Sequence, residues 1–172
     1  RSCGSRLRYA AQRRSCTPTR TDVTSRVIVL DANVLMRALL GRQVDRLLQA
    51  YAARVTFLAP EVAFDDVREH VATVLHKRGE VNALEPALEK LAALRLVVRA
   101  VDPAEYEVMK PSAMARIEPR DPDDWPVLAC ALAFNCPIWT EDRDFFGTGV
   151  ATWTTSLVEQ YLSESDPGLA DH

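Results

Sequence analysis

Short apolar runs with the length of buried strands alternate along this chain with longer segments that have helical spacing. The predicted strands span residues 27–30, 55–58, 96–101, 137–140 and 150–152. The segments between them are long enough to be crossover connections, which parallel strands require. We therefore predict an α/β fold, a three-layer α/β/α sandwich with a mostly parallel central sheet of four to five strands.

The helices are predicted from the spacing of apolar residues and from Gly and Pro punctuation. Pro60 suits the first turn of a helix that Gly79 ends, and Pro111 is expected to interrupt a helix that starts at Pro103. The predicted helices span residues 33–40, 44–54, 60–78, 80–94, 103 onward, 121 or 124 to 135, and 154–162. We predict one domain over residues 26–162 and a flexible tail over 163–172.

The charge is distributed unevenly along the 172 residues, although the net charge is only −3. Residues 1–26 hold seven Arg and one acid, a net of +6, and residues 27–172 hold 14 basic and 23 acidic residues, a net of −9. An acidic domain that binds nucleic acid would depend on local Arg and Lys groups or on bound metal ions.

Residues 1–25 are rich in Arg, Ser and Thr and lack hydrophobic periodicity. An organellar transit peptide and a basic nucleic-acid-binding arm are two interpretations of that composition. We favour a disordered basic extension or a misplaced translation start, and we leave this segment out of the fold argument.

The four cysteines, Cys3, Cys16, Cys130 and Cys136, show no Cys-x-x-Cys spacing. Cys130 lies in an apolar helix and Cys136 at a strand entrance, so both are expected to be buried free thiols. This usage is typical of a reduced, cytoplasmic protein. The sequence also has no apolar run of about 18 residues, so no membrane span is expected.

Acidic residues stand where the chain leaves apolar strands or opens helices: Asp31, Asp66, Asp124 and Asp142. If the strands are parallel neighbours, their carboxyl ends converge and bring these carboxylates together. Grouped carboxylates repel one another unless a cation lies between them, and hard oxygen ligands suit Mg²⁺ or Mn²⁺. Zinc is not expected, because His70 and His76 are six residues apart and fall on different helix faces.

Each acid also has a simpler structural interpretation. Asp31 could serve only as a helix N-cap, with Asn33 beside it as a supporting group. Among the acids at 121–124, Asp121 before Pro122 suits a cap, so Asp124 is chosen for the site. Asp142 lies closest to the end of the fourth strand, and Asp144 is a second candidate. A solvated acidic turn is the alternative there.

The second acidic position is the least determined. Asp65, Asp66 and Glu69 lie on one helix, and Asp66 borders the predicted apolar stripe of Val62, Val67, Val71, Val74 and Leu75. A position at the edge of the stripe favours Asp66 for a cleft. Asp65 and Glu69 stay open as alternatives.

At this point the chain resembles the PIN-domain ribonucleases, which include VapC-type toxins of bacterial toxin–antitoxin pairs. The resemblance runs from about Val27 to Leu162 and is strongest in the segments 29–35 and 121–132 and in the Thr140-Glu141-Asp142-Arg143-Asp144-Phe145 ending. The middle segment, 59–68, resembles the second-acid helix of the family, where Glu is more usual than Asp.

The resemblance implies Mg²⁺- or Mn²⁺-dependent cleavage of single-stranded or loop RNA by Asp31, Asp66, Asp124 and Asp142. It further implies that Thr140 holds a water or a carboxylate and that Asp144 assists metal binding. An antitoxin protein and a homodimer are the partners it suggests, besides the RNA substrate. A metal-activated water needs no protein nucleophile, which fits the lack of a Ser–His or Cys–His arrangement.

Other functions are weighed against this one. A haloacid-dehalogenase-like phosphatase needs a second Asp two residues after the first, and Asn33 occupies that place. A non-catalytic PIN-like binding module would not need all four acids. An RNA-processing nuclease outside a toxin system cannot be separated from a toxin by this sequence.

Overall fold

The computed structural model describes residues 26–163, and the predictions for residues 1–25 and for the tail beyond Ser163 lie outside it. Five strands form one sheet in the order β3-β2-β1-β4-β5, and every neighbouring pair is parallel. The strands are β1 (Arg26–Leu30), β2 (Val55–Pro60), β3 (Val98–Val101), β4 (Ile138–Trp139) and β5 (Thr152–Trp153). The predicted α/β class and parallel sheet are confirmed.

Helices connect these strands. Between β1 and β3 the chain forms α1 (Ala32–Leu40), α2 (Gln43–Tyr51), α3 (Glu61–Arg78), the 3₁₀ turn η1 (Val81–Ala83) and α4 (Leu84–Leu94). Between β3 and β4 it forms α5 (Pro103–Tyr106), η2 (Glu107–Met109), α6 (Lys110–Ile117), η3 (Pro122–Asp124) and α7 (Trp125–Ala133). The turn η4 (Arg143–Phe145) follows β4, and α8 (Val158–Ser163) follows β5.

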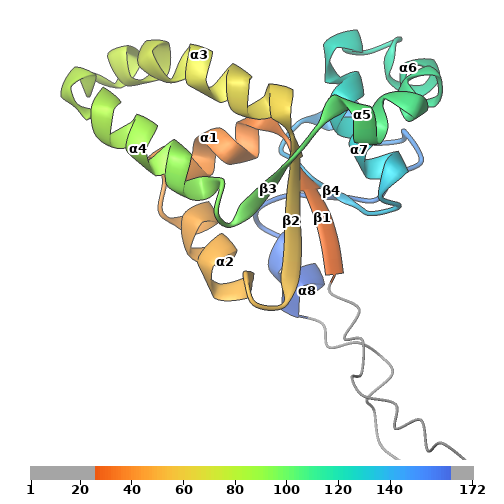
Figure 1. Cartoon of the computed structure of the whole chain (residues 1–172), viewed down its shortest axis with the longest axis horizontal. Helices are drawn as coiled ribbons and strands as arrows, with labels where there is room; N and C mark the ends of the chain where they lie inside the picture. The colour runs from red at the N-terminus through yellow and green to blue at the C-terminus, as the bar shows by residue number, and fades with distance from the viewer. Residues whose placement is uncertain (1–25, 164–172) are drawn as a thin grey trace, which may run out of the picture.

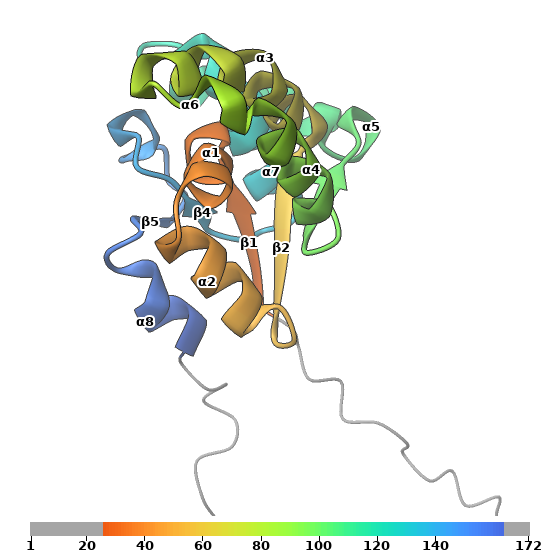
Figure 2. The same ribbon diagram turned by 90° about the vertical axis from the view of Figure 1, so that its left-hand side faces the viewer.

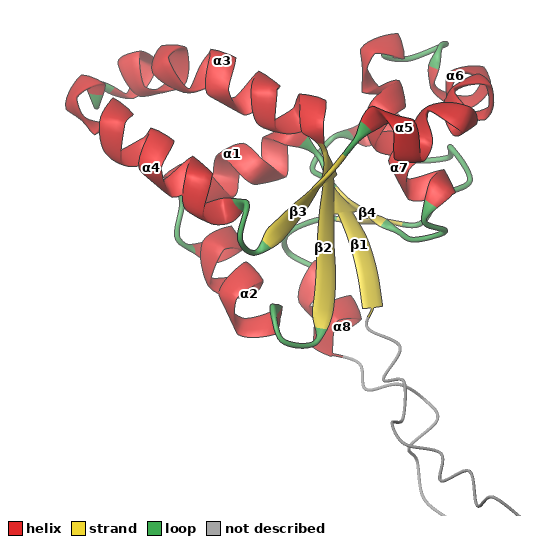
Figure 3. Cartoon of the chain, viewed as in Figure 1, coloured by secondary structure: helices red, strands yellow, loops and turns green. Residues whose placement is uncertain are grey.

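The helices cover both faces of the sheet. Successive side chains of a strand point to opposite faces. Accordingly, Ile28 and Leu30 pack into a core with α1 to α4 and α8, while Val29 packs into a second core with α5 to α7. Figures 1 and 3 show α1 to α4 on one side of the strands and α5 to α7 on the other. The arrangement is the predicted three-layer sandwich.

The order of the strands reverses beside β1. The chain moves outward from β1 to β2 and β3, and then crosses back through α5 to α7 to place β4 on the other side of β1. The backbone N–H of Asp31 donates to the carbonyl of Trp139 (3.3 Å), so the ends of β1 and β4 lie together. Ligands of open parallel sheets bind at such a reversal, beyond the carboxyl ends of the strands.

Three local predictions need correction. The helix from Pro103 is interrupted as predicted, but the break is η2, and Pro111 itself lies in the first turn of α6, where its missing N–H costs nothing. Val62 does not belong to the core stripe of α3; it is 37% exposed, and Ala63 and Phe64 are buried instead. The last helix begins at Val158 rather than at residue 154, after a turn.

Cys130 and Cys136 are free and buried, as expected from their apolar surroundings. Burial raises the pKa of the Cys130 thiol to about 12 and that of Cys136 to about 11, so both stay protonated.

No helix within residues 26–163 is both long enough and apolar enough to cross a lipid bilayer. Figure 2, a view turned by 90°, shows α8 below β5, close to α2.

Candidate active site

Asp31 lies at the carboxyl end of β1, at the junction with α1. Its side chain caps that helix, because Oδ1 accepts a hydrogen bond from the backbone N–H of Val34 (2.8 Å). Its other oxygen, Oδ2, accepts a hydrogen bond from the hydroxyl of Thr140, at the end of β4. Asp31 is only 3% exposed. Asp31 therefore caps α1 with one oxygen and contacts Thr140 with the other, so the capping interpretation does not exclude Asp31 from the predicted site.

Thr140 connects Asp31 to the turn after β4. The buried hydroxyl of Thr140 donates to Asp31 and accepts from the backbone N–H of Asp142 (2.8 Å). The carboxylate of Asp142 in turn accepts from the backbone N–H of Asp144 (2.9 Å) and caps η4. These hydrogen bonds set the position of Asp142 relative to Asp31, although the two residues follow different strands.

Asp124 occupies the last position of η3 and the N-cap position of α7, but its side chain makes no capping hydrogen bond. The capping role in this segment belongs to Asp121, whose side chain accepts from the backbone N–H of Asp123 (3.0 Å). The Oδ2 atom of Asp124 is buried and has no hydrogen-bond partner in the described chain. Such an atom is uncommon in folded proteins, and a binding or catalytic role is one explanation for it.

Asp31, Asp66 and Asp124 line one small cavity of about 50 Å³, which we call the inner cavity. It is lined by Asp31 at the junction of β1 and α1 and by residues of α1, α3, η3 and α7: Ala32, Asn33, Val62, Ala63, Asp66, Asp123, Asp124, Pro126 and Val127. Asp142 lies outside this lining. It borders a larger adjoining hollow of about 560 Å³, which Asn33 also lines. Three of the four predicted acids thus share a cavity, and the fourth lies next to it.

The three candidate acids of α3, Asp65, Asp66 and Glu69, have different surroundings. Asp66 lines the inner cavity, whereas Asp65 forms an exposed ion pair with Arg68 (3.0 Å). Asp66 and Glu69 are both exposed, but Glu69 lines no part of the inner cavity. Burial is the main cause of a raised pKa at Asp66, and Glu69, Asp65 and Asp123 add to it. Among the three, Asp66 is the acid that faces the site.

Two carboxyl groups of the site have raised pKa values. Burial raises the pKa of Asp31 to about 6, although the hydrogen bonds from Thr140 and Val34 oppose the shift. Burial likewise raises the pKa of Asp124 to about 7, and the charges of Asp121, Asp142, Asp31 and Asp144 add to the shift. Loss of solvation and mutual repulsion both penalise the charged forms. A bound cation would relieve both penalties.

The donor set fits a hard divalent cation in kind, because all the converging groups are carboxylate or amide oxygens. No group of three or more His, Cys, Asp and Glu side chains within residues 26–163 is close enough to hold an ion as the side chains stand. An ion at the inner cavity would therefore take part of its ligands from water or substrate. Mg²⁺ ordinarily keeps several waters and binds through one or two carboxylates plus phosphate oxygens.

Sequence reasoning missed four residues at the site. Asp123 lines the inner cavity beside Asp124, and Arg37, Glu141 and Arg143 line the adjoining hollow. Glu141 accepts a hydrogen bond from the backbone N–H of Thr155 (2.7 Å). Arg37 could have been found, because it lies four residues after Asn33 and so shares a face of α1 with it. The position of Arg143 depends on the course of the turn after β4, which no sequence pattern reports.

The comparisons with known proteins agree with this geometry. The model of the PIN domain family matches residues 29–163. A chain from the crystal structure of VapBC2 from Rickettsia felis, bound to a DNA fragment from their promoter, superposes with a TM-score of 0.60. The two are 14% identical, and the alignment covers 74% of this chain and 98% of that chain.

A second solved structure, a toxin-antitoxin complex from Klebsiella pneumoniae, gives a TM-score of 0.50 at 15% identity. It covers 74% of this chain and 97% of the other. No curated protein sequence matches significantly. Identities this low show a shared fold, while the family match rests on the sequence itself and extends over most of the chain. The chain belongs to the PIN-domain family, whose members are generally nucleases.

Proposed function

We propose that this protein is a metal-dependent endoribonuclease that hydrolyses phosphodiester bonds of RNA. The observation that carries the proposal is the inner cavity. It is lined by Asp31, which Thr140 holds in place, and by Asp124, whose buried Oδ2 has no hydrogen-bond partner within residues 26–163. Membership of the PIN-domain family supports the reaction class.

In this proposal Asp31 and Asp124 are the carboxylates that would hold Mg²⁺ or Mn²⁺, with Asp66 in the inner cavity and Asp142 in the adjoining hollow completing the site. When bound, the cation makes a water more acidic and offsets negative charge on the phosphate. Thr140 positions Asp31 and Asp142, as its hydrogen bonds indicate. Asp142 or Asp124 orients the attacking water by accepting its hydrogen bond. Asn33 lies between the two cavities and offers a neutral amide to substrate or water.

The proposal is tested by incubating the purified full chain with single-stranded RNA. We expect cleavage in millimolar Mg²⁺ or Mn²⁺ and none in excess EDTA, with activity restored when the cation is added back. A matched single-stranded DNA serves as the substrate control. Cleavage that persists in EDTA would rule out the metal-dependent mechanism, and uncut RNA in both cations would rule out the function.

The second acidic ligand is tested with neighbouring Asp→Asn variants. Asp66→Asn is expected to lower the cleavage rate about 10- to 100-fold, because its carboxylate faces the inner cavity. Asp65→Asn removes the same charge one position away, but its carboxylate pairs with Arg68 and is expected to matter little. Rates measured in parallel at fixed Mn²⁺ would reject the assignment if Asp65→Asn lost as much activity as Asp66→Asn.

We further propose that the nuclease is the toxin of a toxin–antitoxin pair and that an antitoxin protein is its partner. The two solved structures that share the fold come from VapBC2 and from a toxin-antitoxin complex, which supports this role. Expression of the chain alone should then arrest growth, and the Asp124→Asn variant should not. Normal growth with active enzyme would favour RNA processing instead.

A further inference from the structure

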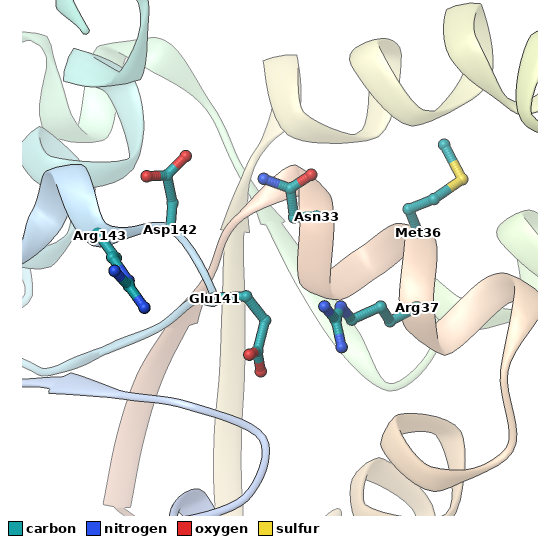
Figure 4. A pocket seen from close by; sticks show the side chains of 6 residues that line it. All are labelled: Asn33, Met36, Arg37, Glu141, Asp142 and Arg143. Carbon is teal, nitrogen blue, oxygen red and sulfur yellow. The ribbon is translucent and has the colours of Figure 1, made fainter. Parts of the chain in front are cut away.

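A wide hollow adjoins the inner cavity on the side of β4, and we call it the outer hollow. It has a volume of about 560 Å³ and is lined by Asn33, Met36, Arg37, Glu141, Asp142 and Arg143. Figure 4 shows the contributions of the two segments, with Asn33, Met36 and Arg37 on α1 and Glu141, Asp142 and Arg143 on the turn after β4. Asn33 lines both cavities, so the outer hollow lies next to the inner cavity.

The two guanidinium groups of the outer hollow are available for a ligand. Arg37 and Arg143 are exposed, and within residues 26–163 neither side chain donates a hydrogen bond or forms an ion pair. Three other arginines are engaged within the fold. Arg95 pairs with Glu61 (2.7 Å), Arg116 donates to the backbone carbonyl of Thr148, and Arg120 donates to the backbone carbonyls of Asp144 and Phe146.

The two acids of the outer hollow are engaged with backbone groups. Glu141 accepts from the N–H of Thr155 (2.7 Å), and Asp142 accepts from the N–H of Asp144 (2.9 Å). Arg37 is near enough to Glu141 to help lower the pKa of that carboxyl, after the hydrogen bonds from Thr155. The carboxylates are therefore tied to the turn, whereas the guanidinium groups can reach toward a bound anion.

RNA needs such groups here because the domain as a whole is acidic. Residues 26–163 hold 15 basic and 20 acidic residues, a net charge of −5, and the inner cavity is lined by four aspartates. Arg offers a planar fork of donors that matches phosphate oxygens, and it also stacks on bases. Met36 adds an apolar side chain to the lining of the outer hollow.

We propose that the outer hollow binds the RNA backbone next to the bond that is cut, with Arg37 and Arg143 each contacting a phosphate. This inference rests on the proposed ribonuclease function and adds the direction in which the strand leaves the site. From the scissile phosphate at the inner cavity, the strand passes Asn33 and enters the outer hollow between α1 and η4. Arg37 and Arg143 are binding residues in this scheme, and the acids remain the catalytic ones.

The test measures binding rather than cleavage, by fluorescence anisotropy of a labelled single-stranded RNA with full-length protein in Mg²⁺. The Asp124→Asn background prevents turnover in every sample. Arg37→Gln and Arg143→Gln are each expected to weaken binding about 3- to 10-fold near 50 mM salt and to reduce the salt slope by about 0.7. Arg46→Gln removes an equal charge from the exposed surface of α2, outside both cavities, and is expected to change binding less than about 2-fold.

The outcomes separate this inference from the proposed function. If the wild-type protein cleaves RNA but Arg37→Gln and Arg143→Gln bind like Arg46→Gln, the outer hollow is not the subsite and the nuclease proposal stands. If RNA binding depends on both arginines but the wild-type protein never cleaves, the subsite stands and the nuclease proposal fails. Absence of RNA binding by the Arg46→Gln control and its parent would overturn the subsite.

Discussion

Replacing Asp124 by Asn is expected to lower the rate of RNA cleavage by at least about 100-fold while the fold remains intact. Asp124 lines the inner cavity, and no described group satisfies its Oδ2, so we expect the carboxylate to serve a ligand rather than the fold. Asn has nearly the same shape but cannot supply the negative charge that a divalent cation requires. Asp45→Asn is the matched control, because Asp45 pairs with Lys90 (2.9 Å) and lines neither cavity.

The same variant is expected to be more stable than the wild type when metal is absent. Burial and neighbouring acids raise the pKa of Asp124 from 3.8 to about 7 in the folded protein. Between about pH 4 and pH 7 the folded state therefore holds a proton that the unfolded state has lost, and stability falls as the pH rises through that window. Above about pH 7 the folded protein carries the full free-energy cost of a charged Asp124, and the substitution by Asn removes that cost.

Each unit of pKa corresponds to about 1.4 kcal/mol, and partial solvation of Asp124 reduces the effect, so we expect a gain of about 1–2 kcal/mol at pH 8 in EDTA. The advantage should vanish near pH 4. Urea unfolding at both pH values measures it. A variant that is inactive but also less stable at pH 8 would show that Asp124 supports the fold and would remove it from the site.

Replacing Thr140 by Val is expected to reduce cleavage about 10- to 100-fold although Thr140 itself binds no ligand. Val keeps the shape of Thr but removes the hydroxyl that donates to Asp31 and accepts from Asp142. The hydrogen bond from Thr140 opposes the effect of burial on the pKa of Asp31, so its loss raises that pKa further. The pH–rate profile of the variant should accordingly shift to higher pH.

Thr140→Ser retains the hydroxyl and is expected to restore both the rate and the pH profile to within a few-fold. Thr148→Val is a control for the loss of a buried hydroxyl, since Thr148 donates to the carbonyl of Phe145 (2.8 Å) and lines neither cavity. We expect both Val variants to lose about 1–3 kcal/mol of stability, but only Thr140→Val to change the pH profile. An unchanged profile in Thr140→Val would contradict the positioning role.

Much of the local structure is readable from the sequence because its signals are short in range. The apolar runs, Gly79 with its positive φ of 73°, and Pro60 before α3 determine where elements begin and end. The boundaries that were wrong lie where these signals compete. Pro111 opens a helix rather than breaking one, and the exposure of Val62 depends on which face of α3 meets the sheet.

Sequence alone determined that acids follow the strands and that Asp31 lies at the end of β1, since both facts depend on neighbouring residues along the chain. Only the tertiary structure decided which acids meet. It paired the ends of β1 and β4 through Thr140, brought α7 across so that Asp124 joined Asp31, and turned Asp65 toward Arg68 instead of the cavity. The reason is that charge repulsion and burial act through space, and the residues involved are separated by up to 109 positions in the chain.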